Sequence, residues 1–350
     1  MYRIILALAT CASAAIDLRG VELYSNQSVR FGRWEIRMKA AASPGTVSSF
    51  FTYQPDSYLD APNPWREIDI EVLGNKPTSF QSNLITGTAS SKNTSESVHA
   101  IGSDLSTTYH TYTLDWTPDS VVWRMDGKNV RKTTAPDQQV VDLRDSTETF
   151  RMNLWASTSV AWVGKLDTTK LPVLQIVHWM RFSTYTPGAG PGGSNFTSAW
   201  IDTFKTLNRS RWAMGNWTFD QNYATFSANN CKVIDGHLVM MLSTTAKEGQ
   251  FPATFPHDST SSSSIQDRNA TSTTTKGFLS RGMDGIWRAV SASPQLEAFD
   301  LGGRKVAVGK LTATGQELDL RAFANALLII RQGVLSVRLP PGAAGTVSLR

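Results

Sequence analysis

Three acidic residues, Glu67, Asp69 and Glu71, alternate with aliphatic residues in one short segment of the sequence. In a β-strand the side chains of residues i, i+2 and i+4 point to the same face, so the three carboxyl groups would project together. Carboxylates that lie close together resist simultaneous ionisation, which raises the pKa of at least one of them. Two carboxyl groups with separated pKa values can act as nucleophile and general acid, so this spacing predicts glycoside hydrolysis.

Aromatic and amide residues flank the acidic segment. The cluster Phe50 to Tyr53 precedes it, Trp65 stands at its start, and Gln81 and Asn83 share one face of the next expected strand. Sugar rings stack on aromatic side chains, and their hydroxyl groups need amide partners. These residues favour a carbohydrate cleft over the alternative, a strand whose acidic side chains are simply hydrated.

The separation of the two outer acids sets a geometric condition. On a flat strand the Cα atoms of Glu67 and Glu71 would lie roughly 13 Å apart, at about 3.3 Å per residue. A retaining glycosidase holds its two carboxyl groups about 5 to 5.5 Å apart. We therefore expect the sheet to be concave at this segment.

Short strands separated by turns predict an all-β architecture from about residue 30 to 242. Residues 31–39 alternate apolar and charged side chains, which is typical of a half-buried strand. Residues 111–116 and 121–125 predict two more strands, and Asp126-Gly127 is a hairpin turn signal. Many short strands at this spacing indicate a β-sandwich or barrel.

The two ends of the chain differ in composition from its middle. Residues 1–15 contain Arg3, an apolar run and Ala12-Ser13-Ala14, which together predict a signal peptide. A lipoprotein signal with Cys11 as the lipidated residue is the alternative. Residues 246–276 are expected to be a linker, because eleven of the 18 residues from 258 to 275 are Ser or Thr. We therefore place the catalytic domain at residues 16–245 and a small β-module at residues 277–350.

Charge and composition exclude several other classes of protein. The net charge is +5, but residues 277–350 hold nine basic and five acidic side chains, so the rest is nearly neutral. A nucleic-acid partner is not expected, because no basic stripe with interleaved aromatics occurs. No apolar run after the signal reaches the length of a membrane span.

Removal of the signal would take Cys11 with it and leave Cys231 without a disulfide partner. No spacing of His, Cys or acidic residues identifies metal ligands.

Several motifs resemble glycoside hydrolase family 16, and among its members the bacterial 1,3-1,4-β-glucanases, or lichenases. They are the acidic segment 67–71 and residues 45–53, 151–155 and 161–164. Residues 200–204, 211–212 and 216–220 resemble the segment that opens ordinary lichenases, yet here they follow the acidic segment. The resemblance covers about residues 20–245 and implies a circular permutation with its joint near residues 187–195, which Pro and Gly dominate.

The resemblance implies a fold and a set of residue roles. The fold would be a circularly permuted, concanavalin A-like jelly-roll β-sandwich followed by the C-terminal β-module. Glu67 would be the nucleophile of a retaining mechanism, Glu71 the general acid/base, and Asp69 the residue that orients and tunes them. The substrate subsites would be lined by Phe51, Tyr53, Trp65, Gln81, Asn83, Asn153, Trp155, Trp162 and Trp217. Trp116, Trp123, Trp179 and Trp212 are assigned to packing. No cofactor is expected for catalysis, and the family implies a structural calcium held largely by backbone carbonyls.

The predicted activity is endo-cleavage of β-1,4 bonds adjacent to β-1,3 bonds in mixed-linkage β-glucans such as lichenan and barley β-glucan. The alternatives are a non-catalytic glucan-binding lectin on the same sandwich, or a family 16 enzyme with the specificity of a laminarinase or xyloglucanase. The segment from Phe299 to Ile330 resembles C-terminal sorting modules, which implies contact with an export machinery. We expect a secreted or surface-attached monomer.

Overall fold

The computed structural model describes residues 17–258 and, further along the chain, the backbone of strands between residues 278 and 348. Contacts divide the chain into two units, residues 1–269 and 270–350. The predicted signal peptide and most of the predicted linker lie outside the described residues.

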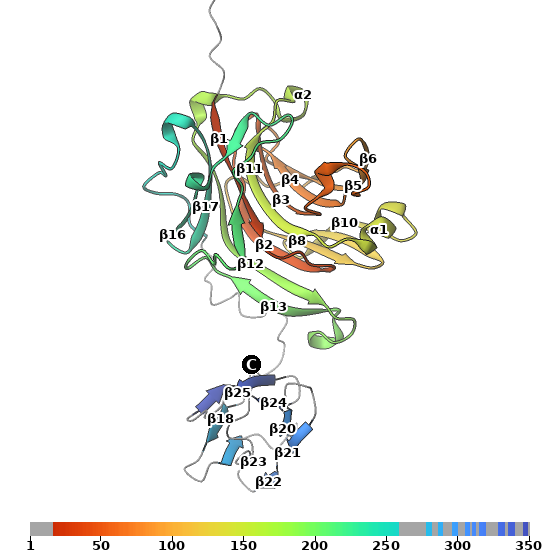
Figure 1. Cartoon of the computed structure of the whole chain (residues 1–350). Coiled ribbons are helices and arrows are strands. Elements are labelled where there is room, and N and C mark those ends of the chain that lie inside the picture. Colours follow the sequence, from red (N-terminus) through yellow and green to blue (C-terminus); the bar gives the residue numbers. More distant parts are fainter. Residues whose placement is uncertain are drawn as a thin grey trace, which may run out of the picture. The chain divides into compact units, whose positions relative to one another are not determined.

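The first layer of unit 1 is a curved sheet in the order β14-β1-β11-β3-β4-β5, with β6 and β7 both paired to β5 (Figure 1). The bounds are β1 (Leu18–Ser25), β3 (Thr46–Tyr53), β4 (Glu67–Leu73), β5 (Ser79–Thr88), β6 (Ser91–Thr94), β7 (Ser97–Ala100), β11 (Thr149–Ala156) and β14 (Trp212–Met214).

The second layer has the order β10-β9-β8-β2-β12, and both β13 and β17 pair with β12 along different stretches. The first residues of β1 also pair with β15 and β17, so this strand links the two layers. Apart from the parallel pair β1–β15, the strand pairs within residues 17–258 are antiparallel. The bounds are β2 (Gly32–Lys39), β8 (His110–Thr117), β9 (Ser120–Met125), β10 (Lys128–Thr134), β12 (Val173–Tyr185), β13 (Phe196–Asp202), β15 (Ala224–Phe226), β16 (Cys231–Ile234) and β17 (His237–Thr244).

The core lies between the layers and is built by alternation along the strands. On β2 the alternate residues Trp34, Ile36 and Met38 are buried, as the sequence pattern predicts. Trp116 and Trp123 are also fully buried, which agrees with their assignment to packing. The antiparallel β-sandwich predicted from the sequence is therefore confirmed.

Short helices and turns connect the strands. Asp126 and Gly127 both have positive φ values, of 48° and 80°, as the predicted hairpin turn between β9 and β10 requires. The helical segments are η1 (Ser57–Leu59), α1 (Gln138–Asp142), η2 (Leu143–Asp145), α2 (Val160–Val163), η3 (Thr168–Lys170), η4 (Pro191–Gly193), η5 (Ala228–Asn230) and η6 (Thr245–Lys247). Within the described residues, no helix has the length and apolar character needed to cross a membrane.

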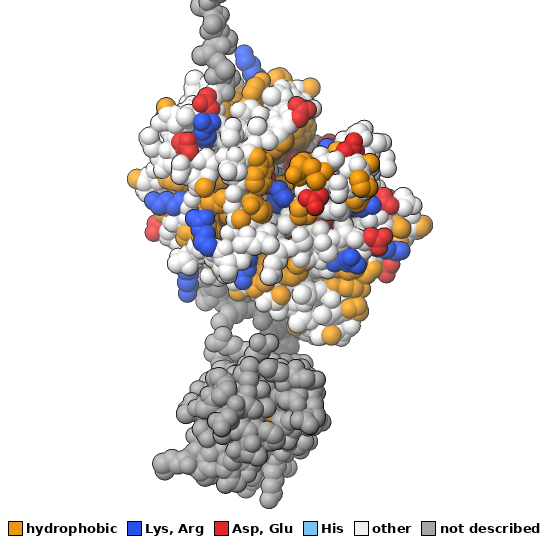
Figure 2. Space-filling view, viewed as in Figure 1, with side chains coloured by type: hydrophobic (Ala, Val, Ile, Leu, Met, Phe, Trp, Pro, Cys, Tyr) orange, Lys and Arg blue, Asp and Glu red, His pale blue; other side chains and the backbone are white. Residues whose placement is uncertain are grey.

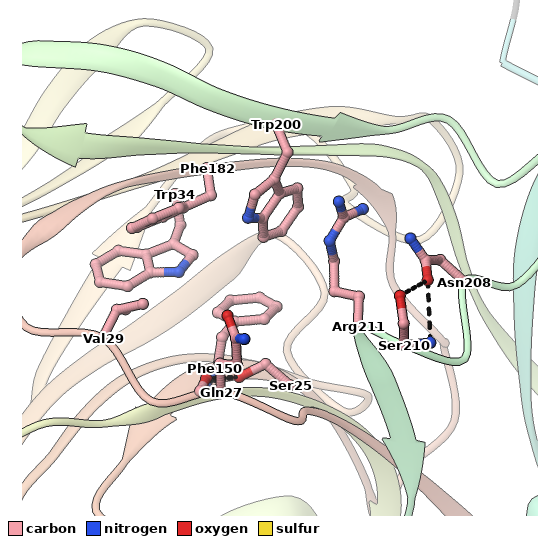
Figure 3. A pocket seen from close by; sticks show the side chains of 10 residues that line it. All are labelled: Ser25, Gln27, Val29, Trp34, Phe150, Phe182, Trp200, Asn208, Ser210 and Arg211. Carbon is pink, nitrogen blue, oxygen red and sulfur yellow. Dashed lines mark hydrogen bonds between the residues drawn. The ribbon is translucent and has the colours of Figure 1, made fainter. Parts of the chain in front are cut away.

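One end of the sandwich opens into a pocket of about 230 Å³ between the layers. Figure 3 shows Trp34, Phe150 and Trp200 facing this space, with Gln27 and Arg211 beside it. Its lining contains no carboxylate, so the acidic chemistry predicted from the sequence lies elsewhere.

Unit 2 contains two sheets of short antiparallel strands. One has the order β22-β23-β19-β18-β26, and the other has the order β21-β20-β24-β25. The bounds are β18 (Phe278–Arg281), β19 (Ile286–Ala289), β20 (Leu296–Phe299), β21 (Lys305–Val308), β22 (Lys310–Thr312), β23 (Gly315–Asp319), β24 (Leu328–Gln332), β25 (Leu335–Leu339) and β26 (Thr346–Ser348).

Candidate active site

The three acids stand on one face of β4. The residues between them, Ile68 and Ile70, are fully buried in the core, so Glu67, Asp69 and Glu71 point away from it. The strand begins at Glu67, so Trp65 precedes it. Trp65 nevertheless stays beside the sheet, because its backbone N–H donates to the carbonyl of Gly87 at 2.7 Å.

The register of the neighbouring strands brings the predicted binding residues to the same face. Residues paired across an antiparallel ladder point to the same side of a sheet. The pairs are Glu67 with Tyr53, Asp69 with Phe51 and Asn83, and Glu71 with Ser49 and Gln81; Asn153 and Trp155 extend this face on β11. In Figure 2, hydrophobic and acidic side chains lie around a hollow between the β5–β6 edge and the body of the sandwich.

Glu67 is held by a tryptophan. The indole Nε1 of Trp65 donates a hydrogen bond of 2.6 Å to Glu67 Oε2. Burial raises the pKa of Glu67, while the Trp65 hydrogen bond, the charge of Lys92 and a hydrogen bond from Asp69 act in the opposite direction. The indole and the ammonium therefore favour the carboxylate form that a nucleophile needs.

At Asp69 the neighbouring charges raise the pKa further and do not offset burial. Burial, followed by the charges of Glu67 and Glu71, raises its pKa well above its ordinary value. Its side chain is 5% exposed and shares a hydrogen bond with Glu67. A protonated Asp69 can donate that hydrogen bond, which stabilises a carboxylate on Glu67.

Glu71 is arranged to hold a proton at neutral pH. Burial raises its pKa to about 8, and the charges of Glu67 and Glu96 contribute further. A general acid must be protonated before the reaction, so Glu71 has the electrostatic property of an acid and Glu67 that of its partner.

Amide and indole groups form a second hydrogen-bonded row. Trp162 Nε1 donates to Gln81 Oε1 at 2.7 Å, and Gln81 Nε2 donates to Glu96 Oε1 at 2.8 Å. Trp162 and Trp155 lie 5.9 Å apart between ring centroids, in a small apolar cluster that also includes Trp217. The structure thus places Trp155, Trp162 and Trp217 together, outside the main core.

Besides Lys92 and Glu96, two more charged residues of the site, Arg151 and Glu22, were not predicted from the sequence. Arg151 Nη1 donates to Glu22 Oε1 at 2.8 Å, and Asn153 Nδ2 donates to Glu22 Oε2 at 3.1 Å. The Arg151 guanidinium also lies 4.7 Å from the ring centroid of Tyr53. Arg151 stands two residues before Asn153, so strand alternation could have identified it. Glu22 reaches the site only through the pairing of β1 with β11.

The amide of Asn83 has a structural partner as well as a place on the shared face. Its Oδ1 accepts a hydrogen bond of 3.0 Å from the backbone N–H of Ser95. The Nδ2 donors of Asn83 are the groups left to meet a sugar hydroxyl.

The side chains of the described residues form no metal centre. No group of three or more His, Cys, Asp or Glu residues in this part of the chain could hold a metal ion. The calcium that the resemblance implies would be held largely by backbone carbonyls, which do not belong to such a group.

The sandwich and the carboxylates on its face define a glycoside hydrolase. A family model, glycosyl hydrolases family 16, matches residues 7–171. The β-glucanase of Fibrobacter succinogenes is 47% identical over 249 residues, which cover 70% of this chain and 70% of that protein. The β-glucanase of Bacillus subtilis is 38% identical over 160 residues, which cover 45% of this chain and 61% of that protein. The chain belongs to glycosyl hydrolases family 16.

A solved structure, the β-glucanase of Bacillus licheniformis, is 30% identical, with a TM-score of 0.40. The match covers 47% of this chain and 77% of that chain.

Proposed function

We propose that this protein is a retaining endo-1,3-1,4-β-glucanase. The observation that carries the proposal is the contrast between two carboxyl groups on one strand face. Glu67 accepts a hydrogen bond from Trp65, whereas Glu71 has a pKa raised to about 8. The β-glucanases of Fibrobacter and Bacillus among its relatives support a glucan as substrate.

The first step forms a covalent intermediate. The Glu67 carboxylate attacks the anomeric carbon, the bond to the leaving oxygen breaks, and Glu71 gives its proton to that oxygen. In the second step Glu71, now a carboxylate, takes a proton from water, and the water oxygen displaces Glu67. The anomeric configuration is inverted twice and therefore retained.

The neighbouring groups act on sugar binding. Tyr53, Phe51 and the cluster of Trp155, Trp162 and Trp217 supply apolar faces for sugar rings. Hydroxyl groups of the substrate would be met by Gln81, Asn83 and Asn153.

The decisive assay is the release of reducing ends from barley β-glucan, lichenan, laminarin and xyloglucan. We expect activity on the first two and initial release of the β anomer. Activity on laminarin or xyloglucan only would assign a different family 16 specificity. Binding of glucan without any release of reducing ends would favour a lectin, and initial release of the α anomer would contradict retention.

We also propose a circularly permuted order. β12 and β13 pair directly across the Pro- and Gly-rich joint, and the late strands β15 and β17 pair with β1. The Fibrobacter enzyme aligns over 249 residues, compared with 160 for the Bacillus subtilis enzyme, which supports an order shared with the former.

Secretion is part of the same proposal, since a polymeric glucan is met outside the cell. It rests on the signal-like N-terminus and on the sorting-type sequence of residues 277–350.

We further propose a monomer that carries a structural calcium bound by backbone carbonyls. Titration with EDTA followed by calcium would test the calcium through the melting temperature.

A further inference from the structure

A lysine lies over the tryptophan that holds Glu67. The Lys92 ammonium is 3.4 Å from the centroid of the Trp65 ring, which is within the range of a cation–π interaction. Among the ion pairs of residues 17–258, none involves Lys92. The aromatic ring is therefore the described partner of this charge.

The backbone of the β5–β6 hairpin sets this position. Lys92 pairs with Gly87 in the ladder, and the Gly87 carbonyl accepts the backbone N–H of Trp65 at 2.7 Å. Gly87 has a φ of +97°, and a Cβ at this residue would lie 2.2 Å from the Ser91 carbonyl oxygen. Only glycine allows the hairpin to close so tightly, and the closure brings Lys92 over the indole.

The indole is fixed by three different contacts. Its Nε1 donates to Glu67 Oε2 at 2.6 Å, its ring centroid lies 5.5 Å from that of Tyr53 in a T-shaped arrangement, and Lys92 covers one face. A cation over the ring draws electron density away from the N–H group and makes it a stronger donor. The positive charge of Lys92 also acts on the carboxylate directly.

We propose that Lys92 is a positioning residue for the nucleophile, which acts through Trp65 to orient Glu67 and keep it ionised. The inference rests on the proposed function and adds a residue that the resemblance to the family did not identify. The proposal assigns the charge of Lys92 to the nucleophile, whereas a role in binding the glucan would change KM.

Other charged and titratable groups also face Glu67 and must be held constant in a test. They are Asp69 and Glu71 on β4, Tyr53 on β3, Arg151 on β11 and Glu148 immediately before β11. None of these residues is changed in the variants below.

The test compares Lys92→Met, which removes the charge, with Lys92→Arg, which keeps it, and with Lys128→Met, a control at an exposed lysine of β10. The pH dependence of kcat/KM and kcat is measured on barley β-glucan. Lys92→Met should move the acidic limb of both profiles upward by about half a pH unit. At pH values below that limb, Lys92→Met should also lower kcat several-fold, with KM changed less than twofold.

Lys92→Arg should restore the wild-type profile, and Lys128→Met should not alter it. An acidic limb that stays in place in Lys92→Met, or a change confined to KM, would overturn the proposal in an active enzyme. If the wild-type protein is inactive on all four glucans, the proposed function fails instead. The inference is then decided by a carboxyl carbon-13 NMR titration of wild type and Lys92→Met, with the Glu67 signal identified by its loss in Glu67→Gln. An unchanged Glu67 titration would overturn it.

Discussion

At the scale of single residues, Glu67, Asp69 and Glu71 have the same strand environment but different proton affinities. Trp65 donates to Glu67, Asp69 shares its hydrogen bond with Glu67, and Glu71 has a pKa raised to about 8. Burial is the largest cause of the upward shift in each case. The site therefore holds protons on Asp69 and Glu71 at a pH where exposed carboxyl groups have lost theirs.

Alanine at Glu67 or Glu71 should lower kcat about 1000-fold, because each change removes a group that makes or breaks a bond. Asp69→Asn should lower kcat less, since the amide can still donate to Glu67. Steady-state kinetics on barley β-glucan measures these effects, and circular dichroism checks that the fold is retained. A wild-type rate in any of the three variants would contradict the assigned roles.

The pH profile of kcat/KM should be bell-shaped. The basic limb should lie near pH 8, where Glu71 loses the proton that it must donate. The acidic limb should lie above the ordinary pKa of a glutamate, because the pKa of Glu67 is raised. Because the acids are coupled, the apparent pKa of each limb belongs to the acids as a group and not to one residue. Full activity well above pH 9 would be incompatible with Glu71 as the acid.

Glu71→Gln should stabilise the fold at alkaline pH. A carboxyl group whose pKa is higher in the folded state binds more protons when folded, so its contribution to stability is lost as pH rises from about 4.5 to about 8. The neutral amide removes this loss and should add roughly 1–3 kcal/mol to the free energy of unfolding at pH 8.5, but little at pH 4. Urea unfolding at both pH values measures the difference. Asp56→Asn, at an exposed aspartate, is the control and should not reproduce it.

At the scale of elements, β4 is held from three directions. β3 and β5 pair with it in the plane of the sheet, and Trp123 reaches it from the second layer. Trp123 Nε1 donates to the backbone carbonyl of Asp69 at 2.9 Å. The strand that carries the acids is thereby tied to the opposite layer at its central residue.

Trp123→Phe should cost more stability than Trp116→Phe. Both indoles are fully buried, but Trp116 Nε1 has no hydrogen-bond partner, so the second variant matches the loss of volume without the loss of a hydrogen bond. The difference in the free energy of unfolding should be about 1 kcal/mol. Urea unfolding of both variants measures it. Equal costs would mean that the bond to Asp69 does not stabilise β4.

At the scale of the whole molecule, residues 251–258, which the sequence assigned to the linker, pack against the strands of unit 1. Phe255 packs with Ile176 and Val239 on the outer face of the second layer. Asp258 accepts hydrogen bonds from Arg37 Nε at 2.8 Å and pairs with His178 Nδ1 at 2.9 Å. The catalytic unit therefore extends about a dozen residues past the boundary at residue 245 that the sequence suggested.

Deletion of residues 277–350 should leave kcat/KM of the purified enzyme within about twofold and abolish export. A larger deletion, of residues 251–350, should lower the melting temperature by several degrees, because it uncovers the apolar residues around Ile176. Activity of the culture medium and of the purified chain, with thermal melts, separates the two effects. Loss of glucan affinity in the shorter deletion would assign residues 277–350 to carbohydrate binding.

Much of the fold and of the candidate site could be predicted from local sequence patterns. The alternation along β4 places three acids on one face wherever that strand lies, and the Asp126-Gly127 pair favours positive φ values. These features depend on neighbours in sequence, so the sequence by itself determined the all-β class, the acidic trio and the hairpin. Only the tertiary structure decided that Glu22 and Lys92 join the site. Glu22 arrives through the register between β1 and β11, which are far apart in sequence. Lys92 arrives because the β5–β6 hairpin meets Trp65, a contact between segments that no local preference sets.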